Sequence, residues 1–363
     1  MSMNGFKKID VYIIIKFLGT YFFAIALIIS IAVVFDLSEK VEDFLEKEAP
    51  LKAIVFDYYM NFIPYFANLF SSLFTFIAVI FFTSKMAYNT EIIAILSAGV
   101  SFRRIMLPYF ISAFIIAMFS FLLMAYIIPP ANAVRLDFTY KYIKNPIDNS
   151  ERDIHRQIEP GLFVYMQSYN IKSDVGYKFA MERFENGELK SKLLSEYIKW
   201  DTTLNKWTIK NYHIRDIEGL HESISHGTSI DTTLNLYPED FKRYAQFVET
   251  MSLPELNEYI EEQKMQGADN VVSLLIEKYN RFAYPFSTFI LTLIGVSLSS
   301  RKVKGGIGMH IGLGLLLSFS FILFMRFAAM FAVSGSMKPL IAVWLPNILY
   351  ALIAIFLYRL APK

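Results

Sequence analysis

Long apolar runs are the feature that most constrains this chain, because each helix that crosses a bilayer needs about 20 predominantly apolar residues. Six runs have that character: Val11–Phe35, Pro64–Ser84, Ile105–Ile128, Phe282–Leu298, Ile307–Val333 and Leu340–Tyr358. Pro129-Pro130 is expected to end the third run. The first run is too long for a signal peptide, and no small-residue cleavage site follows it. The sequence therefore predicts a protein with six membrane spans.

Composition excludes several other classes of protein. Of the 363 residues, 55% are hydrophobic and only 19% are charged, whereas soluble domains carry about 25% charged residues. The net charge of +2 gives no basic excess that would suggest a nucleic-acid partner. The chain has no cysteine, which excludes disulfides, Cys-ligated metals and thiol catalysis.

Lys and Arg in short loops predict which way such a chain crosses the membrane. With six spans, the basic residues near the termini and in two loops all fall on one side: Lys7, Lys8, Lys16, Lys85, Arg103, Arg104, Arg301, Lys302, Lys304, Arg359 and Lys363. The other side has an acid-rich loop, Asp36–Lys52, and the long segment Ala131–Asn270. We therefore expect both termini in the cytoplasm and the long segment outside it.

The long segment alternates apolar and polar residues between Ile154 and Tyr237, which is the pattern of half-buried strands. Four stretches show this alternation: LFVYMQSY, YKFAMERFE, KLLSEYIKW and KWTIKNYHIRDIE. Consecutive strands joined by tight turns predict an antiparallel sandwich or roll. We expect a helical stalk over Ala131–Lys144 before the strands. We also expect a helix over Met251–Gly267 after them, with Ser252 at its N-cap.

No catalytic grouping stands out in the sequence. His221 and His226 leave a metal pair open, although solvated loop histidines are the simpler interpretation. The segment RKVKGGIG, Arg301–Gly308, lacks both the GxxxxGK[ST] spacing and a preceding strand, so it predicts a basic turn between two spans. We therefore expect no cofactor and no bound metal, and we expect the chain not to hydrolyse ATP by itself.

Arg326 lies inside the fifth apolar run, and charges in such positions usually mark function. Two interpretations stay open: the side chain snorkels to the interface, or it contacts an anionic ligand. The six runs contain no Asp or Glu in their interiors. That pattern argues against a carrier coupled to protons or sodium, which usually needs an intramembrane carboxylate.

Four stretches resemble the lipopolysaccharide-export permease family LptF/LptG, also called YjgP/YjgQ: IDVYIIIKFLGTYF, NTEIIAILSAGVSFRRIMLP, RFAYPFSTFILTLIGVSLSSR and PLIAVWLPNILYALIAIFLYR. Their order and spacing extend over essentially the whole chain, and the first looks more like LptG than LptF. The resemblance implies an α-helical membrane protein with six transmembrane helices (3+3) and an inserted periplasmic antiparallel β-jellyroll domain. Residues 1–130 would form the first transmembrane half, residues 131–270 the stalk and jellyroll, and residues 271–363 the second half.

The resemblance also implies a machine in the bacterial inner membrane. Such permeases belong to an ABC exporter that extracts lipopolysaccharide and passes it to a periplasmic bridge. An LptF-like and an LptG-like permease form a heterodimer, an LptB-like cytoplasmic ATPase dimer drives them, and a bitopic LptC-like protein is a further partner.

Within that family the segment at about residues 89–100 matches a cytoplasmic coupling helix that docks on the ATPase. Glu91 in its first turn suits the helix dipole and is placed to pair with a basic residue of the ATPase. The other expected features of this segment are an N-cap at Asn89 or Thr90, an apolar face of Ile92, Ile95 and Leu96, an end at Gly99, and Arg103 beside a second cap at Ser101. The alternative is a helix that only rests on lipid headgroups.

Lipid A phosphates need Lys or Arg near the outer leaflet, and the family places basic residues at the outer end of span one and just after span three. Arg135 matches the second place. The first place departs from the family pattern, because Asp36 follows Phe35 directly and the nearest base is Lys40. The remaining candidates are Arg281 and Arg326. Phe residues in spans one, two and five would line an apolar cavity for acyl chains.

Two other functions stay open. The chain would otherwise be a membrane-anchored periplasmic lipid-binding or scaffold protein without transport, or a secondary transporter. The coupling-helix pattern favours the exporter, and the missing intramembrane carboxylates argue against the secondary transporter.

Overall fold

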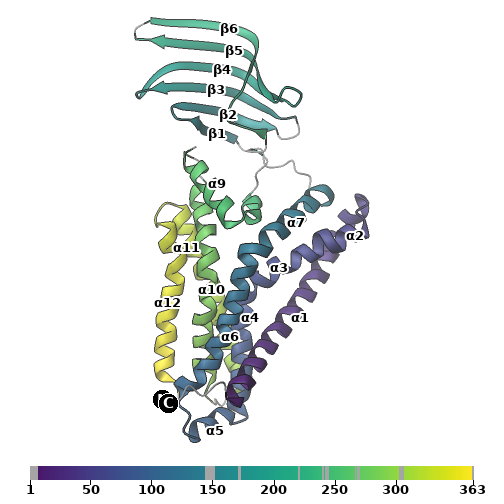
Figure 1. The fold of residues 1–363 in the computed structure, drawn as a ribbon, viewed down its shortest axis with the longest axis vertical. Coiled ribbons are helices and arrows are strands. Elements are labelled where there is room, and N and C mark those ends of the chain that lie inside the picture. Colours follow the sequence, from purple (N-terminus) through teal and green to yellow (C-terminus); the bar gives the residue numbers. More distant parts are fainter. Residues whose placement is uncertain are drawn as a thin grey trace. The chain divides into compact units, whose positions relative to one another are not determined.

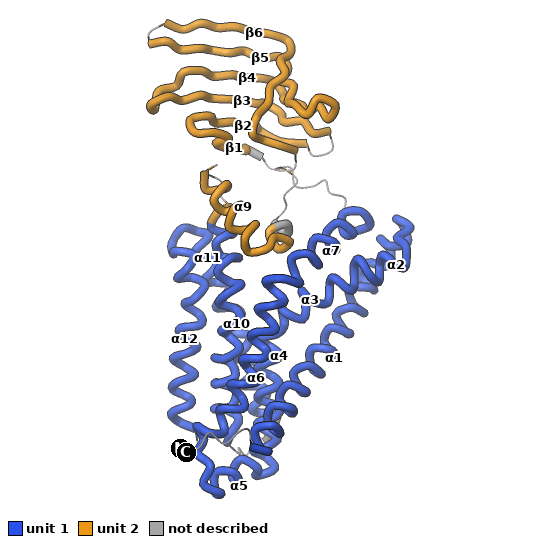
Figure 2. The backbone as a smooth tube through the Cα atoms, in the orientation of Figure 1, with its two compact units in different colours: residues 1–143, 272–363 blue, residues 144–271 orange. Residues whose placement is uncertain are grey.

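The computed structural model describes residues 7–143, 152–170, 173–219, 221–238, 241, 245–265, 267, 270–301 and 306–361. Three basic residues used to predict orientation, Lys302, Lys304 and Lys363, lie outside these ranges, as does Lys144 at the end of the expected stalk. The chain forms two compact units (Figure 2): residues 1–143 and 272–363 make unit 1, and residues 144–271 make unit 2.

Unit 1 is helical (Figure 1). Its elements are α1 (Lys8–Glu46), α2 (Leu51–Ala53), the π-helical η1 (Ile54–Tyr59), α3 (Met60–Leu69), α4 (Ser71–Tyr88), α5 (Glu91–Ser97), α6 (Phe102–Leu122), the π-helical η2 (Leu123–Ile127), α7 (Ile128–Tyr142), α10 (Val271–Ser299), α11 (Gly306–Val333) and α12 (Pro339–Leu360). Among the described residues, six helices are long and apolar enough to cross a membrane: α1, α4, the continuous α6–α7, α10, α11 and α12. The predicted number of spans is confirmed.

The first helix is longer than the sequence predicted. The acid-rich segment from Asp36 was expected to be a loop, but α1 continues to Glu46 without a break. Asp36 and Lys40 form an i,i+4 ion pair in this extension, and such pairs support a helix beyond its apolar part. The expectation of a loop did not take into account that Asp36 and Lys40 are opposite charges spaced to pair on a helix.

Pro129-Pro130 follow the third apolar run but do not end its helix, which continues into the helical stalk expected over Ala131–Lys144. The helix passes from α6 through the π-helical turn of η2 into α7, where the two prolines occupy the first turn. Proline lacks the backbone N–H that a continuous helix would bond to the preceding turn. The wider π-helical turn accommodates the change in hydrogen bonding within one span.

The second span is broken at Phe70, which separates α3 from α4. Side chains from other helices bond to both sides of the break: Tyr21 of α1 to Ser71 at 2.7 Å, Ser120 of α6 to Asn68 at 2.5 Å, Tyr284 of α10 to the Leu69 carbonyl at 2.9 Å, and Ser287 of α10 to Ser72 at 2.8 Å. Lipid offers no hydrogen bonds, so polar groups at such a break need protein partners. The break is therefore a point at which α1, α6 and α10 all contact the second span.

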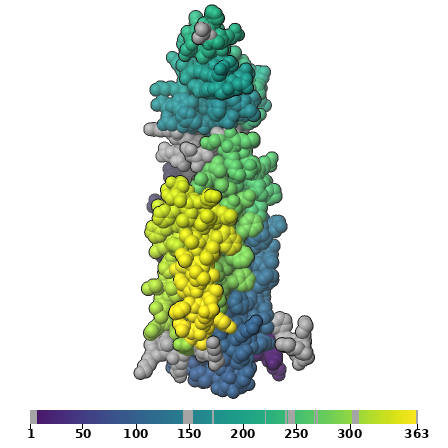
Figure 3. All heavy atoms as spheres, turned by 90° about the vertical axis from the view of Figure 1, so that its left-hand side faces the viewer, coloured from purple at the N-terminus to yellow at the C-terminus, as the bar shows by residue number. Residues whose placement is uncertain are grey.

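Close packing joins α4 to α10. A Cβ atom on Gly295 would lie 2.7 Å from Val79 Cγ1 and 3.2 Å from Phe76 Cδ2. Small residues at helix contacts of this kind let membrane helices approach closely. Figure 3 shows α12 in yellow on the surface of unit 1. Its exposed side chains include the apolar Ile348, Leu352 and Phe356.

The described residues of unit 2 form an antiparallel sheet of six strands that follow chain order. The strands are β1 (Arg152–Glu159), β2 (Leu162–Asn170), β3 (Val175–Glu185), β4 (Glu188–Asp201), β5 (Lys206–Glu218) and β6 (His221–Thr232). Trp207 is fully buried and donates its indole N–H to the Leu236 carbonyl at 2.7 Å, and Tyr169 stacks on Phe241. An inserted antiparallel β domain, as predicted, is confirmed.

The strand β6 was not among the four expected stretches. Its residues, HESISHGTSIDT, are almost all exposed in the structure. They are mostly polar, so the sequence lacks the apolar alternation that indicates a half-buried strand. It is the last strand of the sheet, and polar side chains protect such an edge from pairing with other chains. His226 lies in this strand opposite His213, rather than in a loop.

Unit 2 ends with the 3₁₀ segment η3 (Ala245–Thr250) and helix α9 (Leu253–Met265), which confirms the helix expected there. The Glu255 carboxylate accepts the backbone N–H of Ser252 at 2.8 Å, and this hydrogen bond lowers the pKa of Glu255. The spacing of Ser252 and Glu255 is that of a capping box.

Candidate functional site

Helix α5 lies at one end of unit 1, beside the starts of α1 and α6 and the end of α12 (Figure 1). Gly99 has a φ of 81°, and its N–H bonds to the Leu96 carbonyl at 3.0 Å, as in a helix that ends on a left-handed residue. The expected side-chain caps are absent from this part of the structure. Thr90 and Ser101 hold the N-cap positions of α5 and α6, but neither side chain bonds to its helix.

The expected apolar face of α5 points into its own bundle. Ile92 is buried in the cluster formed with α1, α4 and α6, and Ile95 and Leu96 pack against it. Because these three side chains pack inside the bundle, they are not the surface that α5 offers to a partner. The exposed face carries Ile93, which is 51% exposed, and the neighbouring Ala94. Periodicity alone does not separate these two faces in a helix of seven residues.

Glu91 contacts two side chains at the start of α5. Its Oε2 accepts a hydrogen bond from the Tyr12 hydroxyl of α1 at 3.2 Å, and its Oε1 accepts one from the Asn89 amide at 3.1 Å. Glu91 is half-buried, and Arg103 in the first turn of α6 is exposed. A carboxylate accepts about four hydrogen bonds, so Glu91 retains capacity for a cation.

A buried ion pair lies beside this contact. Asp10 in the first turn of α1 is 1% exposed and binds Arg104 of α6 through both oxygens, at 2.7 and 2.6 Å. The backbone N–H of Lys7 adds a third hydrogen bond to Asp10, at 2.8 Å. Bidentate pairs of this kind are geometrically specific. The pair joins the beginnings of two spans, and no pattern in the sequence predicts it, because its two residues lie 94 positions apart.

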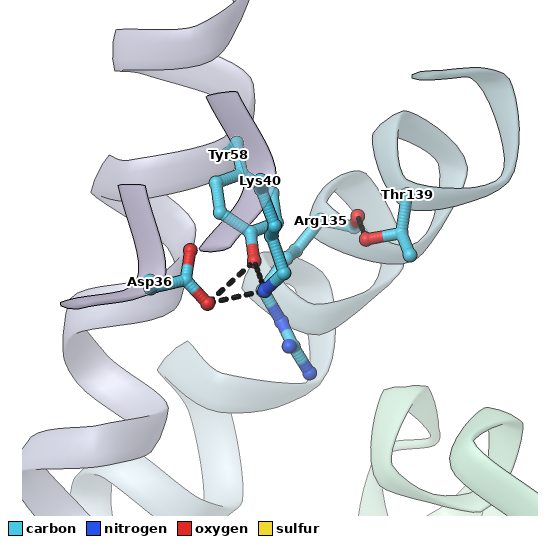
Figure 4. Close-up of polar contacts among 5 residues, drawn as sticks. All are labelled: Asp36, Lys40, Tyr58, Arg135 and Thr139. Carbon is cyan, nitrogen blue, oxygen red and sulfur yellow. Dashed lines mark hydrogen bonds and ion pairs between the residues drawn. The ribbon is translucent and has the colours of Figure 1, made fainter. Parts of the chain in front are cut away.

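At the opposite end of unit 1, Lys40 is the centre of a cluster of polar groups (Figure 4). Its ammonium donates to the Asp36 carboxylate and to the Tyr58 hydroxyl, and Tyr58 donates to Asp36 at 3.3 Å. Aromatic rings from three other elements surround Tyr58: Phe44 of α1, Phe62 of α3 and Phe138 of α7. These rings hold the hydroxyl in place beside the charges.

Arg135 of α7 is the second cation of the cluster. Figure 4 shows its side chain extending from α7 into the neighbourhood of Lys40 and Tyr58, where its positive charge opposes the rise in the pKa of Tyr58 that burial causes. The guanidinium lies 5.3 Å from the centre of the Tyr65 ring, and its Nε donates to Asn132 at 3.3 Å. Stacking and bonding of this kind fix the direction of an Arg side chain. The structure thus places two of the expected phosphate-binding residues, Lys40 and Arg135, around one tyrosine.

Burial and the Asp36 carboxylate raise the pKa of Tyr58, so the phenol keeps its proton and remains a hydrogen-bond donor. The buried Oδ2 atom of Asp36 has no hydrogen-bond partner among the described residues. Asp36 is the negative charge that balances Lys40 when no other anion is bound. Sequence reasoning identified Asp36 as a departure from the family pattern but did not place it against Lys40.

The other two expected cations lie elsewhere in unit 1. Arg281 of α10 is 3% exposed and pairs with Glu277 one turn earlier, with 3.2 Å between Nε and the carboxylate. Arg326 of α11 is exposed. Arg281 is therefore already neutralised within its own helix, whereas Arg326 presents its charge on the outside of the described bundle.

A mostly apolar cavity of about 370 Å³ lies beside the break in the second span. Phe22 and Ile25 of α1 and Phe119 of α6 line it, and Asn68 and Ser71 supply polar atoms. Within the described ranges there is no group of three or more His, Asp or Glu side chains that could hold a metal ion.

The fold and the site define a class: a helical membrane protein with an inserted antiparallel β domain. Its helical unit has a short helix at one end and the Lys40 cluster at the other. Residues 11–360 match the family described as lipopolysaccharide export system permease LptF/LptG. The chain belongs to this family and is a permease component of lipopolysaccharide export. A comparison with curated protein sequences found no match.

Proposed function

We propose that this chain is the LptG-like permease of an ABC exporter, which takes lipopolysaccharide from the inner membrane and passes it to a periplasmic bridge. The match to the LptF/LptG permease family over residues 11–360 is the observation that carries the permease role, and the choice of LptG rests on the resemblance of IDVYIIIKFLGTYF to that member. Energy would come from a separate cytoplasmic ATPase dimer. An LptF-like permease and a bitopic LptC-like protein would complete the complex, with both termini in the cytoplasm and the β domain in the periplasm.

The α5 end of unit 1 is the proposed ATPase contact. Exposed Ile93 offers an apolar side chain to a groove of the partner, and Glu91 and Arg103 offer charges of opposite sign. Ile92, Ile95, Leu96 and Gly99 would act indirectly, by holding α5 on its bundle and by ending it.

The Lys40 cluster is the proposed site for the phosphates of the lipid. Lys40 and Arg135 supply two positive charges and Tyr58 supplies a hydroxyl, and phosphate oxygens form strong charge-assisted hydrogen bonds with such groups. Arg326 is a secondary candidate, because an exposed charge on a membrane span needs an anion or the interface. Arg281 would support α10 through Glu277. The cavity lined by Phe22 and Phe119 is a candidate place for an acyl chain.

The test is reconstitution of the chain with its ATPase and partner permease in proteoliposomes that contain lipopolysaccharide. A photo-reactive amino acid at position 135 should capture lipopolysaccharide, and its release should require ATP. If the chain co-purifies with no ABC ATPase from native membranes, a membrane-anchored lipid-binding protein without transport is the better description. Release driven by an ion gradient instead of ATP would identify a secondary transporter.

A further inference from the structure

Tyr12 connects α1 to the helix proposed to contact the ATPase. Its hydroxyl donates to Glu91 Oε2 at 3.2 Å across 79 residues of chain, and its ring packs against Phe82 of α4 at a centroid distance of 6.1 Å. Asn89 occupies the other oxygen of Glu91. Tyr12 is therefore the link between Glu91 and a membrane span.

Helix α1 is suited to pass movement from one end of unit 1 to the other. It runs without a break from Lys8 to Glu46 and contains no proline. At 1.5 Å per residue, Tyr12 and Lys40 are about 42 Å apart along its axis. At its start, the Asp10–Arg104 pair holds α1 to α6. The same rigid helix thus carries the contact with Glu91 near one end and Lys40 near the other.

We propose that Tyr12 is a positioning residue that joins Glu91 to α1, so that a displacement of α5 reaches the Lys40 cluster through α1. This inference rests on the proposed function, because it needs a partner that moves α5. A partner cation can bind Glu91 while Tyr12 stays bonded, since a carboxylate has more acceptor sites than Tyr12 and Asn89 use. The hydrogen bond between Tyr12 and Glu91 therefore persists when the partner binds Glu91.

The test is Tyr12→Phe in the complete complex, in proteoliposomes that contain lipopolysaccharide. Phenylalanine keeps the packing on Phe82 and removes the hydroxyl. We expect complex yield and ATP hydrolysis to stay within about twofold of wild type, while lipid released per ATP falls about two- to tenfold, the range of one hydrogen bond. The matched control is Tyr126→Phe, because Tyr126 is 71% exposed and has no hydrogen bond among the described residues. The control should release lipid as wild type does.

A double variant separates action through Glu91 from a general loss of structure. If Tyr12 acts through Glu91, adding Tyr12→Phe to Glu91→Ala should lower lipid release per ATP no further than Glu91→Ala alone. Additive losses, or a Tyr12→Phe complex that releases lipid as wild type does, would overturn the inference. A wild-type complex that releases no lipid with ATP would instead overturn the proposed function.

Discussion

The guanidinium of Arg104 binds both carboxylate oxygens of Asp10, 94 residues earlier in the chain, at 2.7 and 2.6 Å. Only 2% of the Asp10 side chain is exposed, whereas a third of Arg104 is. Removing one partner of a buried pair is costly because the other charge stays behind unpaired. The first turns of α1 and α6 therefore depend on this pair for their relative position.

Arg104→Ala should lower the free energy of unfolding by about 2 kcal/mol, less than for a fully buried pair because Arg104 reaches solvent. Unfolding of the purified chain in mixed micelles would measure this loss. The matched control is Arg103→Ala, since Arg103 is the exposed neighbour, and its effect should stay within about 0.5 kcal/mol. Equal losses for the two variants would show that the pair with Asp10 does not stabilise unit 1.

Ile93→Glu and Ile92→Ala should separate partner binding from packing. Ile93 is exposed, so a charge there should lower co-purification of the ATPase by at least about tenfold while leaving the stability of the isolated chain unchanged. Ile92 is buried, so Ile92→Ala should cost about 2–4 kcal/mol of stability in the isolated chain. Both quantities are measurable on the same preparations, by pull-down and by unfolding. Unchanged ATPase recovery with Ile93→Glu would contradict the assignment of the exposed face.

Asp36→Asn should strengthen binding of a phosphate-bearing lipid about three- to tenfold, because the carboxylate that neutralises Lys40 is removed. Lys40→Ala should weaken the same binding by a similar factor. Binding of lipopolysaccharide to the purified complex, compared with a lipid that lacks phosphate, measures both effects. Glu39→Gln is the control, since it removes the neighbouring charge without changing the bonds of Lys40. Weaker binding by the Asp36 variant would mean that Asp36 positions Lys40 instead of competing for it.

Tyr284→Phe should destabilise unit 1 by about 1 kcal/mol, because it removes the donor to the Leu69 carbonyl at the break in the second span. Tyr126→Phe, at an exposed tyrosine outside the break, should leave stability unchanged. Unfolding in mixed micelles compares the two variants. An identical small effect at both positions would show that the break finds its hydrogen bonds elsewhere.

The gross architecture was readable from the sequence because hydrophobic length and period are local properties. Six apolar runs predicted six spans, and the alternation of apolar and polar residues between Ile154 and Tyr237 predicted strands. Where the sequence prediction went wrong, the cause was a partner far away in the chain. The second span looked continuous from Pro64, yet the helix is broken at Phe70. Side chains of α1, α6 and α10 form hydrogen bonds with the polar groups beside the break. The acid-rich segment after Asp36 looked like a loop, yet it is the C-terminal part of α1.

The candidate sites divide in the same way. The resemblance of the sequence to the permease family selected Glu91, Lys40 and Arg135 as candidates to bind a charged partner or phosphate. Tertiary structure decided that Tyr12 bonds to Glu91, that Asp36 neutralises Lys40, and that Ile93 rather than Ile92 is exposed. The physical reason is that burial and pairing depend on which surfaces meet. Residue type and spacing determine what a side chain is able to bind, and the folded neighbours determine what it binds.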